Sequence, residues 1–212
     1  MADVNRIFTY LENPSIRLGL LKACKLLIVG PVNMRRQINQ LINKEIKFAK
    51  HKKPAGITLK FNSLSDGLLI GKLTEAAKAG VQIKLIIRGI CCMFTENRKF
   101  KKPIEAISII DEYLEHARVM IFENNSDPKV FISSADWMVR NINHRIEVAC
   151  PVLEKDLRDE IINIIDIQLK DNIKARELDN ELSNQYINPR NTKKIRSQIE
   201  IFNYLNRATS SK

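Results

Sequence analysis

Val81-Gln-Ile-Lys-Leu-Ile-Ile87 is a near-continuous run of apolar, β-forming residues, as expected of a strand that is buried on both faces. A helical pattern from about Asp66 to Ala79 precedes this run, and Gly80 stands where helices commonly end in a left-handed residue. A second short strand pattern, Ile57 to Phe61, lies before the helix. A strand, a helix and a strand in this order predict a βαβ unit and therefore a parallel sheet.

Further strand and helix patterns extend on both sides of this unit. Upstream, the sequence predicts a short helix capped by Asp3, a strand at 24–29 closed by Gly30-Pro31, and a helix from Asn33. Downstream, the predicted elements are strands at 104–110, 117–123, 129–133 and 144–150, a turn at 124–128, and helices from Glu154 and from about Thr192 to Arg207. We therefore expect one α/β core with appended helices.

Length and composition are typical of a globular protein of one domain or slightly more. The chain has 212 residues, of which 44% are hydrophobic and 28% are charged. No apolar run approaches the roughly 20 residues that a membrane span needs, and the first residues lack the layout of a secretory signal. The four cysteines show no metal-ligand spacing, which favours reduced thiols and a cytoplasmic location.

Charge is the most informative part of the composition. The 35 Lys and Arg residues exceed the 24 Asp and Glu residues by 11, and the pI is near 9.6. So basic a chain favours polyanions, namely nucleic acid, anionic lipid or polymeric phosphate, and composition does not choose among them. The basic residues gather at 44–53, 98–102 and 190–196, and each cluster by itself is equally typical of a solvated surface.

Arg88 directly follows the predicted buried strand and is the first candidate for a binding residue. In open α/β sheets, ligands bind beyond the carboxyl ends of the strands, where an arginine can grip a phosphate with two hydrogen bonds. The alternative is an arginine that only caps the end of the sheet. The sequence contains neither a P-loop nor a Rossmann glycine motif, so those two kinds of nucleotide site have no support.

His116 begins a second candidate motif, His116-Ala-Arg-Val-Met-Ile-Phe-Glu123. By residue type this is His-x-Arg-x4-Glu, which is similar to the His-x-Lys-x4-Asp signature of the phospholipase D superfamily. Strand alternation places His116 and Arg118 on one face, where both can contact one phosphoryl group. Ser133-Ser-Ala-Asp136 follows at the place of that superfamily's second element, Gly-Ser-x-Asn. A lone histidine at a strand start is also often structural, and His51 and His144 show no partner pattern.

Several segments in a fixed order carry a more specific resemblance. They are Ile86–Cys92, Tyr113–Arg118, Ile121–Asn124, Ser133–Met138, Arg140-Asn141, Arg145–Val148 and Glu181–Asn184. Together they closely resemble the C-terminal region of the bacterial polyphosphate kinase family that works through a phosphohistidine. The resemblance covers nearly the whole chain. It implies an α/β fold, namely a phospholipase D-like mixed sheet with flanking helices and a C-terminal helical extension.

The resemblance also implies chemistry, because that family transfers the terminal phosphate of ATP to polyphosphate, reversibly and with magnesium. It implies that Arg88 and His116 contact nucleotide phosphate, that Arg118 binds phosphate beside them, and that His116 is the catalytic residue in this chain. Ser134 and Asp136 are candidates for supporting these side chains from behind. We identify no magnesium ligand, because the family's magnesium-binding arginines and its phosphohistidine belong to the preceding catalytic half.

The same resemblance predicts how the chain is organised. Residues 1–23 resemble the end of the preceding half, 24–152 the phospholipase D-like domain, and 153–212 the C-terminal helices of that domain. The loop from Phe94 to Pro103 departs from the family, in which it is richer in glycine and proline. We therefore expect a truncated product or a separately encoded half, whose partner is a complementary fragment that carries the phosphohistidine.

Three functions stay open on the sequence alone. The first is the C-terminal half of a polyphosphate kinase, which contacts ATP and polyphosphate but has little or no turnover by itself. The second is a half-site phosphodiesterase or nuclease that builds one site as a homodimer; its basic charge suits DNA. The third is a non-catalytic remnant that binds polyanions through charge.

Overall fold

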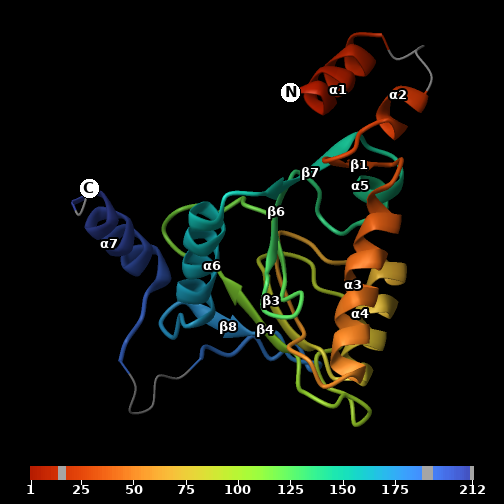
Figure 1. The fold of residues 1–212 in the computed structure, drawn as a ribbon. Helices are drawn as coiled ribbons and strands as arrows, with labels where there is room; N and C mark the ends of the chain where they lie inside the picture. Colours follow the sequence, from red (N-terminus) through yellow and green to blue (C-terminus); the bar gives the residue numbers. More distant parts are fainter. Residues whose placement is uncertain (14–17, 188–192, 211–212) are drawn as a thin grey trace.

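The structure, a computed structural model, describes residues 1–13, 18–187 and 193–210, which form one mixed sheet with helices on both faces (Figure 1). The helices are α1 (Ala2–Glu12), α2 (Gly19–Lys22), α3 (Met34–Lys50), α4 (Gly67–Ala79), α5 (Val139–Asn143), α6 (Lys155–Leu169) and α7 (Ser197–Ser210). The strands are β1 (Ile28–Gly30), β2 (Gly56–Phe61), β3 (Gln82–Ile87), β4 (Glu105–Ile109), β5 (Val119–Phe122), β6 (Lys129–Ser133), β7 (Glu147–Val152) and β8 (Ala175–Glu177).

The predicted βαβ unit is present as β2, α4 and β3, and its two strands pair in parallel with Ile57 opposite Ile83. Asp66 begins α4 by accepting the backbone N–H of Leu69 at 3.0 Å. Gly80 ends the helix in the left-handed region, with φ of 102°, as its position in the sequence predicts. The local signals and the tertiary pairing therefore agree in this part of the chain.

The sheet has the strand order β1-β7-β6-β5-β2-β3-β4-β8, so the βαβ unit lies near its middle. Strands β2, β3 and β4 run parallel to one another. Strand β5 pairs antiparallel with β2, and β6 and β7 continue the antiparallel pattern. The β2–β5 boundary thus joins a parallel half to an antiparallel half, and the predicted mixed sheet is confirmed.

Two apolar layers hold the helices against the sheet. Helices α3 and α4 lie side by side on one face, where Ile38, Ile42 and Leu73 pack against Leu59 and Leu85 (Figure 1). Helix α6 covers the other face through Ile165 and its apolar neighbours. No helix in the described part of the chain is long and apolar enough to cross a membrane.

Strand β3 is less uniformly buried than its sequence predicts. Residues Leu85 to Ile87 are buried, but Gln82 and Lys84 are half-buried, so the expectation of a strand covered on both faces holds only for its second half. That second half leads directly to Arg88. The end of the strand that presents the candidate arginine is therefore the part with the most complete core around it.

The remaining differences concern short elements. The strand predicted at 24–29 is reduced to β1, because the backbone N–H groups of residues 25–27 turn toward the Asp3 carboxylate, at 2.7 to 3.2 Å. Asp3 is accordingly not the cap of its own helix, whose N-cap is Met1. The first three residues of the strand predicted at 144–150 form the turn that follows α5, and β7 begins at Glu147.

The segment after residue 153, predicted as helical, also supplies a strand. Strand β8 pairs antiparallel with β4 and extends that edge of the sheet. It follows a turn in which the buried Asp171 carboxylate accepts the N–H groups of Ile173, Lys174 and Ala175. The predicted start of the last helix, Thr192, lies outside the described residues, and the described helix α7 begins at Ser197.

Candidate functional site

Four segments far apart in the sequence meet at one end of the sheet. Asn62 follows β2 and Arg88 follows β3, so both lie at the carboxyl ends of neighbouring parallel strands. Because β5 runs antiparallel to β2, with Val119 opposite Lys60, the residues just before β5 reach the same end. Strand β6 reverses direction again, which brings Asp136 there as well. The topology therefore assembles the sequence-predicted residues Arg88, His116, Arg118 and Asp136.

Arg88 is half-buried and is held by Asn62. Its Nε and Nη2 donate to Oδ1 of Asn62 at 3.2 and 2.8 Å. The next residue, Gly89, approaches so closely that a Cβ there would lie 2.9 Å from the carbonyl oxygen of Asn62. One edge of the guanidinium is thus fixed, while Nη1 has no partner within the part of the chain that the structure describes.

Asp136 links this arginine to the second one. Its Oδ1 accepts the backbone N–H groups of Asn62 and Ser63 at 2.8 and 3.2 Å, and its Oδ2 pairs with Nη2 of Arg118 at 3.1 Å. Burial raises the pKa of the Asp136 carboxyl, but the hydrogen bonds from Arg118 and these N–H groups outweigh burial, so the net pKa is lowered. Asp136 is therefore an ionised partner of Arg118, and its role behind the binding residues stays a prediction.

Arg118 has an unsatisfied donor. Its Nε is buried and has no hydrogen-bond partner among the described residues. A buried donor without an acceptor is uncommon in folded proteins, because losing water without a replacement hydrogen bond costs about 1–3 kcal/mol. An oxyanion bound at this end of the sheet is one acceptor that fits such a donor. Of the predicted binding residues, Arg118 is thus the one with a buried donor that is free to bind an oxyanion.

His116 lies beside Arg118 and is exposed. Its Nε2 is 3.2 Å from Nη2 of Arg118, so the two groups predicted to share a face do so. Both residues precede β5 instead of lying within it. Because arginine only donates, the ring nitrogen that contacts Arg118 acts as an acceptor when the two are hydrogen-bonded. Glu123, the last residue of the predicted motif, follows the opposite end of β5 and bonds to Gly56.

Ser134 is not brought to this group by its hydrogen bonds. Its hydroxyl pairs with the buried Glu147 and accepts the N–H of Val148 at 3.1 Å. Glu147 also accepts from Nδ2 of Asn141 at 2.6 Å. The serine therefore ties the end of β6 to β7 and α5, while Asp136, two residues later, turns toward Arg118. Whether Ser134 also supports the binding residues stays a prediction.

Three residues that the sequence analysis did not single out, Lys60, Glu115 and Gln168, lie at this end of the sheet. Lys60, in β2, is buried and pairs with Glu115, the residue before His116. Burial lowers the pKa of Lys60, the charge of Glu115 raises it, and the net direction is down. Gln168 of α6 accepts from Lys60 at 2.7 Å and donates to Glu115 at 2.7 Å. The segment that carries His116 is thereby held to the sheet and to α6.

The described residues include no cluster of three His, Cys, Asp or Glu side chains that could hold a metal ion. The carboxylates at this end are already engaged, Asp136 by Arg118 and Glu115 by Lys60. The donor set is instead that of an anion site, with two guanidinium groups and an imidazole around one buried carboxylate. Such a set suits phosphate oxygens, which accept paired hydrogen bonds from arginine.

Comparisons with known proteins identify the family of the chain. The model of the family described as polyphosphate kinase C-terminal domain 2 matches residues 27–198. A polyphosphate kinase from Vibrio cholerae is 49% identical over 206 residues, which make up 96% of this chain and 28% of that protein. The crystal structure of polyphosphate kinase from Porphyromonas gingivalis matches with a TM-score of 0.93 at 41% identity, over 99% of this chain and 32% of that one.

A more distant likeness shows the fold. A phospholipase D family member, Nuc from Salmonella typhimurium, matches with a TM-score of 0.52 at 14% identity, over 72% of this chain and 96% of that one. The predicted phospholipase D-like fold is thus confirmed. The chain spans less than a third of the length of the two kinases above. Taken with the family model, these matches show that the chain belongs to the polyphosphate kinase family, in which it corresponds to C-terminal domain 2.

Proposed function

We propose that this chain supplies the phosphate-binding half of an ATP–polyphosphate phosphotransferase site. The observation that carries the proposal is the unsatisfied Nε of Arg118, beside His116 and joined through Asp136 and Asn62 to Arg88. Phosphoryl transfer depends mostly on positioning and on stabilising charge on the phosphate oxygens. A pair of anchored guanidinium groups next to an imidazole suits that task.

Each residue has a separate part in this proposal. Arg88, fixed along one edge by Asn62, binds a nucleotide phosphate through Nη1. Arg118, oriented by Asp136, binds the neighbouring phosphate and satisfies its own Nε. His116 donates a proton or hydrogen bond to an oxygen of the phosphate that is transferred. Asn62, Lys60 and Glu115 position these groups and do not touch the substrate.

The proposal assigns no nucleophile to this chain. Covalent capture of phosphate requires a second histidine, which we expect outside these 212 residues, so we expect little or no turnover by them alone. Magnesium, which supplies charge neutralisation when bound to nucleotide phosphates, would reach the site with ATP, since the described residues form no site for it. ATP and polyphosphate as substrates, and a cytoplasmic location, belong to this proposal.

Nucleotide binding to the chain by itself tests the site. Isothermal titration with ATP at low salt should give measurable affinity that falls by about ten- to a hundredfold in Arg88→Ala and in Arg118→Ala, as expected for losing one charge-assisted contact. Lys99→Ala, in the exposed loop after β3, is the matched control for loss of a positive charge. Unchanged affinity in both arginine variants, with strong salt dependence, would instead mean binding through general charge.

Turnover provides a second, independent test. The chain is incubated with ATP, magnesium and short polyphosphate, and chain growth is followed by gel electrophoresis. We expect no growth above background. Robust growth that disappears in His116→Ala would overturn the proposal that the chain lacks its nucleophile. Cleavage of plasmid DNA without metal, abolished by the same substitution, would favour the phosphodiesterase alternative.

A further inference from the structure

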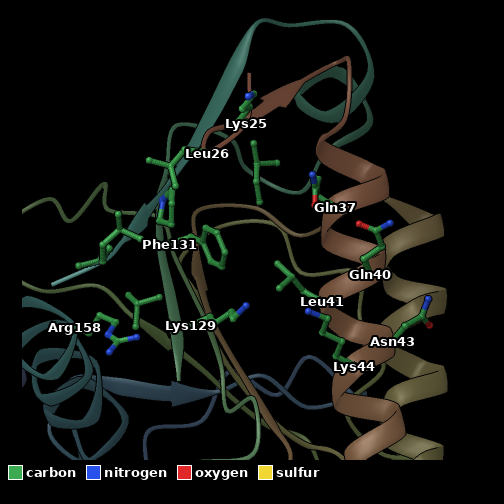
Figure 2. A pocket seen from close by; sticks show the side chains of 15 residues that line it. Lys25, Leu26, Gln37, Gln40, Leu41, Asn43, Lys44, Lys129, Phe131 and Arg158 are labelled. Atoms are coloured by element: carbon green, nitrogen blue, oxygen red, sulfur yellow. The ribbon is translucent and has the colours of Figure 1, made fainter. Parts of the chain in front are cut away.

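A cavity of about 730 Å³ lies between α3 and the edge of the sheet opposite β8 (Figure 2). Strand β1 pairs with β7 only at Glu147–Ala149, so the following residues of β7 have no strand beyond them in the described chain. The cavity lies at this uncovered part of the edge. Its lining is Lys25, Leu26, Ile28, Gln37, Gln40, Leu41, Asn43, Lys44, Lys129, Val130, Phe131, Pro151, Val152, Leu153 and Arg158.

The lining carries positive charge without any acidic residue. Four of its members are Lys or Arg, and none is Asp or Glu. Figure 2 shows Lys44 on α3 and Lys129 on β6 extending toward one another across the cavity. Neither ammonium has an ion-pair partner within the described ranges, in contrast to Lys60 and Lys155 elsewhere in the chain. Two converging, unpaired ammonium groups favour an anion between them.

Arg158 is a second, independent indication that the cavity binds an anion. It is half-buried at the cavity, where Nη1 donates to the carbonyl oxygen of Pro128 at 3.2 Å and lies 3.6 Å from Oδ1 of the exposed Asp127, which is outside the lining. Its Nε is buried and has no hydrogen-bond partner among the residues that the structure describes. The only other arginine Nε in this condition is that of Arg118 at the candidate site, as far as the described chain shows. The cavity thus combines unpaired charge with an unsatisfied buried donor.

Most of the remaining lining is apolar, which narrows the class of ligand. Leu41 and Val152 are half-buried at the cavity, and Leu26 and Leu153 are exposed at it. A purely ionic ligand would leave these side chains in water, whereas a ligand with a flat apolar part would cover them. Gln37 and Gln40 add amide groups that can bond to the polar edge of a ring. The cavity volume lies within the range of small-molecule sites.

We propose that this cavity binds a nucleoside phosphate, with the phosphate between Lys44 and Lys129 and the base against Leu41 and Val152. The position excludes contact with Arg88 and His116. The residue after Lys44, Glu45, accepts the backbone N–H of Gly56 at the start of β2, which is the end of that strand remote from Asn62. Lys129 pairs with Phe122 at the end of β5 remote from His116. A nucleotide in the cavity would therefore be a second ligand of the domain, and the inference does not depend on the proposed phosphotransferase function.

Two-dimensional amide NMR of the chain, titrated with ADP, tests the proposal. We expect shifts at Leu41, Lys44 and 129–131 that persist in the Arg88→Ala/Arg118→Ala variant. In the double variant Lys44→Glu/Lys129→Glu, ADP affinity at these amides should fall at least about tenfold. Lys50→Glu, a single Lys→Glu substitution on the same helix outside the cavity, should alter it by less than about twofold. Emission from Trp137 verifies that each variant is folded.

Two further probes separate the parts of the ligand. Tripolyphosphate carries the charge without the base, and adenosine carries the base without the charge. Both should bind at the cavity more weakly than ADP. Equal affinity for tripolyphosphate would overturn the assignment to a nucleoside phosphate. Shifts confined to residues 62–63, 88–90 and 116–119 would overturn the site itself, while leaving the proposed function intact.

Discussion

Replacing Glu115 by methionine should destabilise the chain much more than replacing its partner Lys60 by methionine. Glu115 has three donors, because Gln168 and Gln198 bond to it at 2.7 and 3.1 Å in addition to Lys60. Lys60 has fewer partners: Glu115, and Gln168 at 2.7 Å. Removing the lysine leaves a hydrogen-bonded carboxylate, whereas removing the glutamate leaves a buried ammonium beside Arg88.

The magnitude follows from the exposure of the two side chains. Breaking a fully buried ion pair from one side costs about 3–5 kcal/mol. The side chain of Glu115 is 25% exposed and that of Lys60 is 8% exposed, so we take the lower end, about 3 kcal/mol, for Glu115→Met. For a chain of this size that corresponds to a fall in Tm of about 6–12 °C. Lys60→Met should change the free energy of unfolding by no more than about 1 kcal/mol.

The two costs should also differ in their dependence on pH. Burial lowers the pKa of Lys60, and Glu115 is the main group that opposes it, so the variant Glu115→Met lowers that pKa further. Between the folded pKa and the unfolded value near about 10.4, the unfolded chain binds more protons, and stability therefore rises with pH. The deficit of Glu115→Met should shrink as the pH is raised from about 7 toward about 9.5.

Urea unfolding at both pH values, followed by fluorescence, measures these effects. Trp137 is the single tryptophan of the chain and is 1% exposed, so its emission shifts to the red on unfolding. The double variant Lys60→Met/Glu115→Met should recover about 2 kcal/mol relative to Glu115→Met alone. Equal costs for the two single variants, or a larger cost for Lys60→Met, would refute the reasoning.

Three other predictions concern the same framework. Asp66 caps α4 and pairs with Arg35 through both carboxylate oxygens, at 2.7 and 2.6 Å. Asp66→Ala should therefore lower the free energy of unfolding by about 2–4 kcal/mol in thermal melts, and Asp66→Asn should lower it by less. Equal losses in the two variants would contradict this account. Gly89→Ala should weaken ATP binding, because the added Cβ meets the carbonyl oxygen of Asn62. Gly71→Ala, with nothing within 4 Å of the added Cβ, should leave ATP binding unchanged and the free energy of unfolding unchanged or higher. Isothermal titration of both variants with ATP measures the difference. Burial raises the pKa of the Asp171 carboxyl, hydrogen bonds from Ser197 and Lys174 lower it, and the net direction is down. The free energy of unfolding should therefore fall as the pH drops below about 4, and it should fall less steeply in Asp171→Asn. Urea titrations from neutral to acidic pH measure both slopes.

The parts of the fold that the sequence predicts well are those in which local signals are strong. The apolar run of β3, the helix pattern of α4 and the glycine after it specify the βαβ unit without tertiary information. The hairpin turn at 124–128 is similar, since Asn124, Asn125 and Ser126 all take positive φ angles that such residues tolerate. Strands β1 and β8, with three residues each, are defined mainly by their neighbours and leave little periodic signal.

The candidate site likewise contains residues that local sequence signals predict and residues whose role depends on tertiary contacts. Arg88 is predictable from its position after a strand, and His116, Arg118 and Asp136 from motif spacing; the structure brings all four to one end of the sheet. Asn62 was accessible by the argument used for Arg88, because it too follows a strand, but no motif marks it. Lys60 reads as an ordinary polar residue of a strand, and only the pairing with Glu115 across 55 residues gives it a role. Likewise, the partner of Ser134 is set by the β6–β7 pairing, which its own sequence neighbourhood does not encode.

The boundary between β2 and β5 has a mechanical consequence for a bound phosphate. On one side of it, the parallel strands present Arg88; on the other, the antiparallel strands present Arg118. A ligand bound by both arginines would connect the two halves of the sheet and would oppose any displacement of one half relative to the other. We then expect slower amide hydrogen exchange along the boundary when the ligand is bound, at Thr58 to Lys60 and at Val119 to Ile121. Ligand binding at one end of the sheet would thus reduce local opening of the strands along its centre.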